Sequence, residues 1–126
     1  MSLKVLVVDD EEGLLDLTQR MLQFKCGYQT VGTGDGLEAV RLFSLHSPQV
    51  CILDVHLDDS KIDGIQVLGE IRKINPAAKC IMITRITQED TIKAAKELGA
   101  CAYLLKPLDS KEWLKIVREV AEGSNG

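Results

Sequence analysis

The chain switches repeatedly between two hydrophobic periodicities, and this alternation restricts its fold more than any other property. Five short apolar runs cover Leu3–Val8, Tyr28–Val31, Val50–Leu53, Cys80–Ile83 and Ala102–Leu105. Apart from Lys4, the first, third and fourth runs are apolar at every position, as expected for strands that are buried on both faces. The runs therefore predict five strands, three of them covered on both sides.

Apolar residues recur at helical spacing in the longer stretches that separate or follow these runs. The stretches are Leu14–Leu22, Leu37–Leu45, Ile65–Ile74, Ile92–Leu98 and a segment that begins at Asp109. We expect Gly99 to end the fourth helix. The segment Asp109-Ser110-Lys111-Glu112 predicts a capping box for the fifth, which turns Trp113, Ile116, Val117 and Val120 inward. Five strands alternating with five helices predict an α/β fold with one open parallel sheet and helices on both faces.

The length of 126 residues fits one domain, which we place at residues 1–122, with 123–126 as a disordered tail or the start of a linker. Its 45% hydrophobic and 27% charged residues exclude a disordered chain. The net charge of -4 does not attract nucleic acid, and no apolar run is long enough to span a membrane. Because no signal peptide is recognisable, we expect a cytoplasmic protein that binds neither nucleic acid directly nor a membrane.

Four cysteines raise the question of a metal or a disulfide. Cys26, Cys51, Cys80 and Cys101 are widely spaced and form no CxxC pair, so the spacing predicts neither. Three of them lie in apolar surroundings, where cysteine acts as a small hydrophobe. We therefore expect reduced, buried thiols.

Polar residues follow the predicted strands where each strand ends. Asp9 and Asp10 follow the first run, Asp54 follows the third, Thr84 the fourth and Lys106 the fifth. The carboxyl ends of parallel strands share one edge of the sheet, where ligands of open α/β folds bind. Three carboxylates at one edge repel one another unless a cation joins them, and oxygen ligands suit Mg²⁺. Such a site can engage a phosphoryl group, with Asp54 as the candidate nucleophile that forms an aspartyl-phosphate.

Each of these residues also has a plainer interpretation. An Asp-Asp pair after a strand commonly caps the next helix, and a threonine at a strand end commonly bonds its own loop. It is their combination at one edge that favours a functional site.

Six motifs in a fixed order carry a resemblance to a known family. They are Val7-Val8-Asp9-Asp10-Glu11, Ile52-Leu53-Asp54, Asp63-Gly64, Ile83-Thr84, Gly99-Ala100 and Lys106-Pro107. Over nearly its whole length the chain resembles the CheY-like receiver domain of two-component response regulators. The resemblance implies the strand order 2-1-3-4-5 of the flavodoxin-like fold. It also implies that Asp54 accepts a phosphoryl group from a histidine kinase or phosphotransfer protein. In such a protein, catalysis is limited to its own phosphorylation and dephosphorylation.

The resemblance further implies a set of metal ligands. Asp10 and Asp54 would bind Mg²⁺ directly, with the backbone carbonyl of His56 as a third ligand and Asp9 acting through water.

It also implies a phosphorylation-driven switch. Thr84 would hydrogen-bond the new phosphoryl group, Lys106 would pair with it across a cis Lys106-Pro107 peptide, and Tyr103 would move inward. The switching surface would be the face of the fourth helix, fifth strand and fifth helix, used for a downstream partner or a homodimer. Its expected members are Ile92, Lys93, Lys96, Tyr103, Lys111 and Lys115.

Three features depart from the family pattern. The loop Val55–Ile62 is about two residues longer than usual and lacks the common proline. His56 lies at a position that tunes the loss of the phosphoryl group, and Arg85 stands where a small residue is typical. We expect Arg85 to cover the phosphoryl group or to pair with Asp58 or Asp59, and so to slow its hydrolysis.

Two alternatives from other classes remain. A phosphohydrolase with an aspartate nucleophile commonly needs a second aspartate two residues on, and that position here is His56. A phosphate-independent interaction module with the same fold would fit the altered loop and Arg85.

Overall fold

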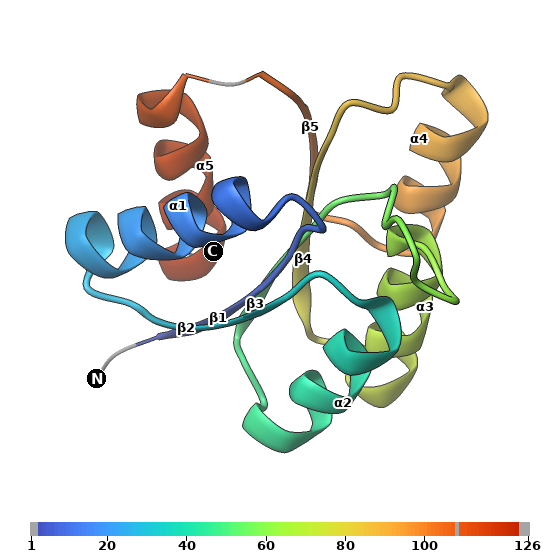
Figure 1. Ribbon diagram of the computed structural model, residues 1–126, viewed down its shortest axis with the longest axis horizontal. Coiled ribbons are helices and arrows are strands. Elements are labelled where there is room, and N and C mark those ends of the chain that lie inside the picture. The colour runs from blue at the N-terminus through green and yellow to red at the C-terminus, as the bar shows by residue number, and fades with distance from the viewer. Residues whose placement is uncertain (1–2, 108, 124–126) are drawn as a thin grey trace.

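Five parallel strands form a single sheet in a computed structural model that describes residues 3–107 and 109–123 (Figure 1). The strands are β1 (Lys4–Val8), β2 (Gln29–Thr33), β3 (Val50–Leu53), β4 (Lys79–Thr84) and β5 (Ala102–Leu105). Their order is β2-β1-β3-β4-β5, which confirms the predicted topology. Residues 124–126 of the expected tail lie outside the described residues.

Helices cover both faces of the sheet, as predicted. They are α1 (Glu12–Met21), α2 (Gly36–His46), α3 (Gly64–Ile74), α4 (Glu89–Glu97) and α5 (Ser110–Glu122). Figure 1 shows α1 and α5 on one side of the sheet and α2, α3 and α4 on the other. None of the helices in the described part of the chain is long and apolar enough to cross a membrane.

Successive residues of the central strands supply two separate cores. Val5, Val7 and Ile52 belong to the cluster on the side of α1 and α5, where Trp113 also packs. The alternate residues, such as Leu6 and Leu53, belong to the cluster beneath α2, α3 and α4. This division confirms that the central strands are buried on both faces, and Trp113 is a core residue.

Two helix ends differ from the prediction. Helix α1 runs on into a π-helical turn, Leu22–Cys26, which Gly27 ends with a φ of 72°. The capping box expected at Asp109 is wrong, because its side chain makes no capping hydrogen bond. The capping box that does form lies at the start of α3, where Asp63 and Gln66 bond each other's backbone amides.

The predicted glycine end of α4 is confirmed. Gly99 adopts a φ of 95°, which favours glycine over other residues. Its amide donates to the carbonyl of Lys96, and the amide of Ala100 donates to that of Ala95, both at 3.0 Å. This pair of bonds is a Schellman motif.

The cysteine prediction is only partly right. Cys51 and Cys80 are buried, but Cys26 is half-buried and Cys101 is exposed. Cys101 precedes β5 at the margin of the sheet, where its amide bonds the carbonyl of Cys80 at 2.7 Å while its side chain stays in solvent. Apolar neighbours in the sequence therefore do not bury a residue at the start of an edge strand.

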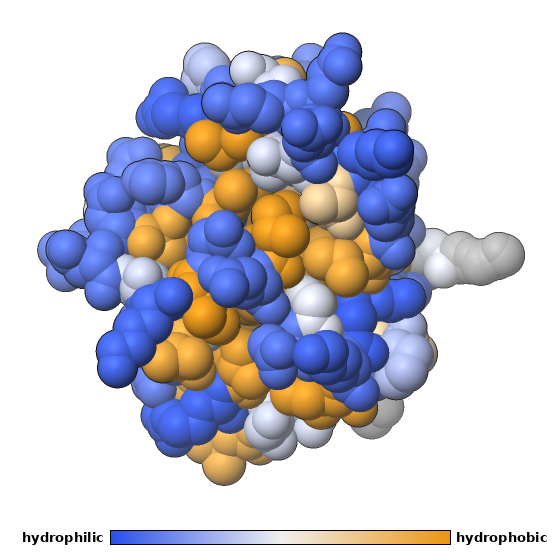
Figure 2. Space-filling view, turned by 90° about the vertical axis from the view of Figure 1, so that its right-hand side faces the viewer, coloured by the Kyte–Doolittle hydropathy of each residue, from blue (hydrophilic) through white to orange (hydrophobic). Residues whose placement is uncertain are grey.

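Apolar side chains also reach the surface over α2, α3 and α4. Figure 2 shows them gathered amid hydrophilic residues on this face. A groove of about 740 Å³ runs here, with apolar walls formed by Leu37, Val40, Ile62, Ile65 and Leu98.

Candidate functional site

The strand register brings the acidic residues together. Val8 pairs with Leu53, so the residues that follow them, Asp9 and Asp54, leave neighbouring strands at the same edge. The amide of Asp54 continues the ladder by donating to the carbonyl of Val8 at 3.0 Å. Together with Asp10, the two place carboxylate oxygens that all lie within 4.8 Å of one another. The predicted acidic cluster is therefore present at the carboxyl edge of the sheet.

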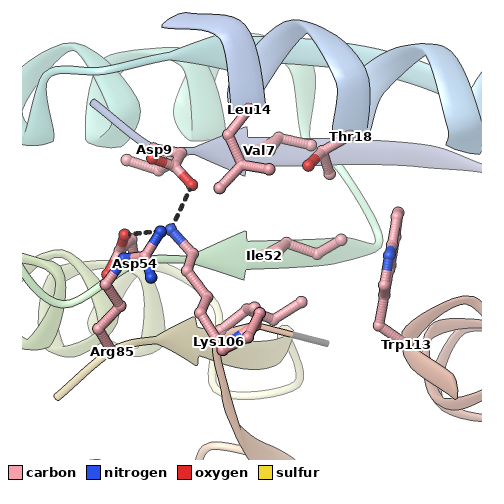
Figure 3. Close-up of a pocket in the computed structure, with 12 residues that line it drawn as sticks. Val7, Asp9, Leu14, Thr18, Ile52, Asp54, Arg85, Lys106 and Trp113 are labelled. Carbon is pink, nitrogen blue, oxygen red and sulfur yellow. Dashed lines mark hydrogen bonds and ion pairs between the residues drawn. The ribbon is translucent and has the colours of Figure 1, made fainter. Parts of the chain in front are cut away.

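Lys106 binds two of these carboxylates at once. Its Nζ lies 2.8 Å from Oδ2 of Asp9 and 2.7 Å from Oδ2 of Asp54 (Figure 3). The amide of Lys106 donates to the carbonyl of Thr84 at 2.8 Å, and the following peptide, to Pro107, is cis as predicted. Burial favours the neutral amine, but the hydrogen bonds and negative charges of Asp54 and Asp9 outweigh it and raise the pKa of Lys106.

The charges of the site do not cancel. Burial raises the pKa of Asp9, against the lowering effect of its bond to Lys106. Asp9 and Asp54 are only 7% and 8% exposed, and one ammonium faces three carboxylates. Asp10, which is half-buried, accepts a hydrogen bond from the amide of Asp58 at 2.7 Å. A buried excess of carboxylate oxygens fits a hard divalent cation such as Mg²⁺.

Thr84 and Tyr103 share a neighbour, the backbone of Ile86. The hydroxyl of Thr84, which is fully buried, accepts a hydrogen bond from the amide of Ile86 at 3.3 Å. The hydroxyl of Tyr103 donates to the carbonyl of Ile86 at 2.7 Å. Burial and, to a smaller extent, the negative charge of Asp54 raise the pKa of Tyr103. The sequence could not predict this link, because both hydrogen bonds use backbone groups of Ile86, which every residue type would offer.

Arg85 has a different partner from those predicted. Its Nη2 lies 3.6 Å from Oε1 of Glu11, and the expected pairing with Asp58 or Asp59 is wrong. Asp58 is already engaged, because its carboxylate lies 2.7 Å from Nε2 of His56. Glu11 follows β1 at the same edge of the sheet as Arg85, so the two side chains meet across the mouth of the site.

The long loop after Asp54 is anchored by close backbone contacts that the sequence did not reveal. A Cβ at Gly64 would lie 1.8 Å from the carbonyl oxygen of Asp54, and the Gly64 amide donates to Val55 at 2.7 Å. The hydroxyl of Ser60 accepts from the amide of Gly36 at 2.8 Å and donates to the carbonyl of Ile62 at 2.7 Å. The additional residues thus fold against the start of α2 and leave the acidic cluster intact.

The expected switching surface lies beside this site. Tyr103 and Ile92 are half-buried on β5 and α4, and the four lysines of this surface, Lys93, Lys96, Lys111 and Lys115, are exposed.

The fold and the site define a class of protein, the CheY-like α/β domains with an acidic pocket at the carboxyl edge. The profile of the response regulator receiver domain matches residues 5–118, and the chain belongs to this family.

Individual relatives agree with this assignment. The chain is 33% identical to sporulation initiation phosphotransferase F of Bacillus subtilis over 112 residues, which cover 89% of the chain and 88% of that protein. It is 36% identical to the alkaline phosphatase synthesis transcriptional regulatory protein PhoP of the same organism, covering 89% of the chain but 45% of the relative. The crystal structure of a CheY-like receiver domain protein from Methanospirillum hungatei superimposes with a TM-score of 0.91 at 25% identity, covering 97% of this chain and 95% of that one.

Proposed function

We propose that this receiver domain is phosphorylated on Asp54 by a histidine kinase or phosphotransfer protein, in a reaction that needs Mg²⁺. The observation that carries the proposal is the contact of Lys106 with both Asp9 and Asp54 inside a cluster of three carboxylates. This arrangement supports the proposal, because a carboxylate that acts as nucleophile would have both a cation and further carboxylates for a metal beside it.

The reaction is a phosphoryl transfer between two side chains. A carboxylate oxygen of Asp54 attacks phosphorus and forms a P–O bond. The P–N bond to the donor imidazole breaks, and its electron pair leaves with the ring nitrogen, which takes up a proton. Lys106 then exchanges its bond to the Asp54 carboxylate for one to a phosphoryl oxygen, and Thr84 supplies a hydroxyl from β4. These groups position the phosphoryl group and neutralise its charge.

The metal ligands we assign are Asp10 and Asp54 directly, the backbone carbonyl of His56, and Asp9 through water. Bound there, Mg²⁺ supplies positive charge that offsets the phosphoryl oxygens. Asp10 suits direct ligation because it is not held by Lys106, and the amide of Asp58 orients its carboxylate.

Incubation with acetyl phosphate, followed by intact-mass analysis, tests the proposal. One phosphoryl adduct is expected in Mg²⁺, and none after chelation with EDTA or in Asp54→Asn. Asp16→Asn, which changes an exposed aspartate on α1, is the matched control and keeps the adduct. An adduct that survives in Asp54→Asn would refute the assignment. The absence of an adduct from both acetyl phosphate and a phosphorylated kinase would favour a phosphate-independent interaction module.

The output surface we propose is α4, β5 and α5, with Tyr103 as its responsive residue. Phosphorylation adds negative charge beside Thr84 and Tyr103, and both are bonded to Ile86 in the segment that leads to α4. Amide chemical shifts recorded before and after phosphorylation should change along residues 84–105 and in α5. Shifts confined to residues 54–64 would exclude this surface.

We further propose that Arg85 lengthens the life of the phosphorylated form. Its side chain lines the same cavity as Asp54 and Lys106, and it forms an ion pair with Glu11 at the mouth of the site. Arg85→Ala should speed dephosphorylation, whereas Arg20→Ala, at an exposed ion-paired arginine on α1, should not. Equal dephosphorylation rates for the wild type and Arg85→Ala would refute this proposal.

A further inference from the structure

A cavity of about 180 Å³ lies between α1, α5 and the sheet, next to the acidic site. Its walls are mainly apolar and are formed by Val7, Leu14, Thr18, Ile52, Ile83, Pro107 and Trp113. Figure 3 shows Asp9, Asp54 and Lys106 at one end of this space and Trp113 at the other. The cavity therefore has a charged end, which the proposed function uses, and an apolar body that it leaves unassigned.

The packing of α1 explains why the space is open. None of the residues of α1 is fully buried, and Leu14 and Thr18, which face the cavity, are half-buried. Helix α5 on the same face buries three side chains, Trp113, Leu114 and Val117. The α1 wall is therefore the less deeply buried side of the cavity.

We propose that the apolar body binds a small neutral aromatic molecule, in the size range from benzene to indole. Apolar cavities of roughly 150 Å³ accept benzene, and the whole cavity here, with its charged end included, has a comparable volume of about 180 Å³. The walls offer a flat indole face at Trp113 and branched aliphatic groups on the strands, which suits ring stacking and hydrophobic contact.

The charged end selects against ionised ligands. Three carboxylates repel an anion, and neither cation of the lining is free to attract one: the ammonium of Lys106 is bonded to Asp9 and Asp54, and Arg85 is paired with Glu11. A cationic ligand would compete for the acidic cluster itself instead of occupying the apolar body. A neutral ring is neither repelled by the carboxylates nor drawn to them in place of the apolar body. It also has no charge to desolvate.

Occupancy should also alter phosphorylation, a consequence that rests on the proposed function. Lys106 and Pro107 line the cavity, as does Ile83, the neighbour of Thr84. A ring in the apolar body would contact the segment that carries the lysine and change its freedom to follow the phosphoryl group.

Trp113, the only tryptophan in the chain, reports binding directly. Titration with toluene should change its fluorescence in a saturable way, with one site per chain. Without added Mg²⁺, benzoate should bind at least about tenfold more weakly, because the carboxylates at the acidic end then repel it. Thr18→Leu, which fills the cavity from α1, should weaken toluene binding by about tenfold or more. Thr91→Leu, the same change on a half-buried threonine of α4, should leave it unchanged. A linear, non-saturating response, or equal affinity in wild type and Thr18→Leu, would overturn the proposal.

A second measurement separates binding from its effect on phosphorylation. Toluene should still bind to Asp54→Asn, which lacks the proposed phosphoacceptor. In the wild type, saturating toluene should change the rate of adduct formation with acetyl phosphate, and Thr18→Leu should lose this response. Saturable binding without any change in rate would refute the coupling but leave the ligand site standing. A protein that binds toluene yet is never phosphorylated would refute the proposed function alone.

Discussion

Replacement of Lys106 by methionine tests how far one buried cation stabilises the acidic edge. The side chains of Lys106, Asp9 and Asp54 are 7%, 9% and 10% exposed. Nζ of Lys106 lies 2.8 Å from the carboxylate of Asp9 and 2.7 Å from that of Asp54. Removal of one partner from a buried ion pair typically costs about 3–5 kcal/mol, because the remaining charge stays buried without compensation. Methionine keeps the length of the aliphatic chain, so the loss in Lys106→Met reflects the charge. We expect a decrease of about 3 kcal/mol or more in the free energy of unfolding at neutral pH without Mg²⁺.

The pH dependence of this loss has a definite sign. Burial already raises the pKa of Asp9 while Lys106 lowers it, so removal of the lysine raises it further. A carboxyl with a raised pKa in the folded state favours folding at pH values below its unfolded pKa of about 3.9, and this contribution is lost as the pH rises. The deficit of Lys106→Met should therefore be largest at neutral pH and shrink as the pH falls toward about 4.

Urea unfolding followed by circular dichroism measures the effect. Lys111→Met, at an exposed lysine on α5, is the control and should change stability little. Added Mg²⁺ should recover part of the loss in Lys106→Met, because the ion neutralises the same carboxylates. If Lys106→Met unfolded at the same urea concentration as the control at neutral pH, the electrostatic reasoning would be refuted.

Three further predictions concern other parts of the chain. Asp10→Asn should abolish the rise in melting temperature that Mg²⁺ gives the wild type, a rise equivalent to about 2.7 kcal/mol at one hundred times the dissociation constant. Burial and the bonded carboxylate of Glu122 raise the pKa of Tyr28, so its stabilising effect should be fully present below about pH 10 and decline progressively as the pH rises above it. Tyr28→Phe should lose about 2 kcal/mol at neutral pH by urea unfolding and show no such alkaline decline. Gly64→Ala should cost about 3 kcal/mol in the same assay, because its Cβ would collide with backbone; stability equal to wild type would contradict the close approach.

The periodicity of the sequence predicted the sheet well because burial on both faces leaves a continuous apolar run. β3 and β5 begin and end at the predicted residues, and β4 extends by one residue at each end. The same reasoning placed Asp9, Asp54 and Lys106 at one edge, since parallel strands end together. These predictions needed only local pattern and the geometry of the fold.

Predictions that depend on particular side-chain partners were less successful. Arg85 pairs with Glu11, whereas the carboxylate of Asp58 lies against His56, and no local sequence pattern reveals either partner. The capping box failed at Asp109 for a similar reason: a favourable sequence permits a bond between side chain and backbone, but the approach of the chain to the helix decides whether it forms.

The shared use of Ile86 by two hydroxyls has a thermodynamic consequence. Thr84 accepts a hydrogen bond from the amide of Ile86 and Tyr103 donates one to its carbonyl, so a displacement of the Ile86 backbone would disturb both bonds. The two side chains therefore form a cooperative unit, and substitutions at them should be non-additive in a double-mutant cycle. Intermediate states, in which one hydroxyl is released while the other keeps its partner, are disfavoured.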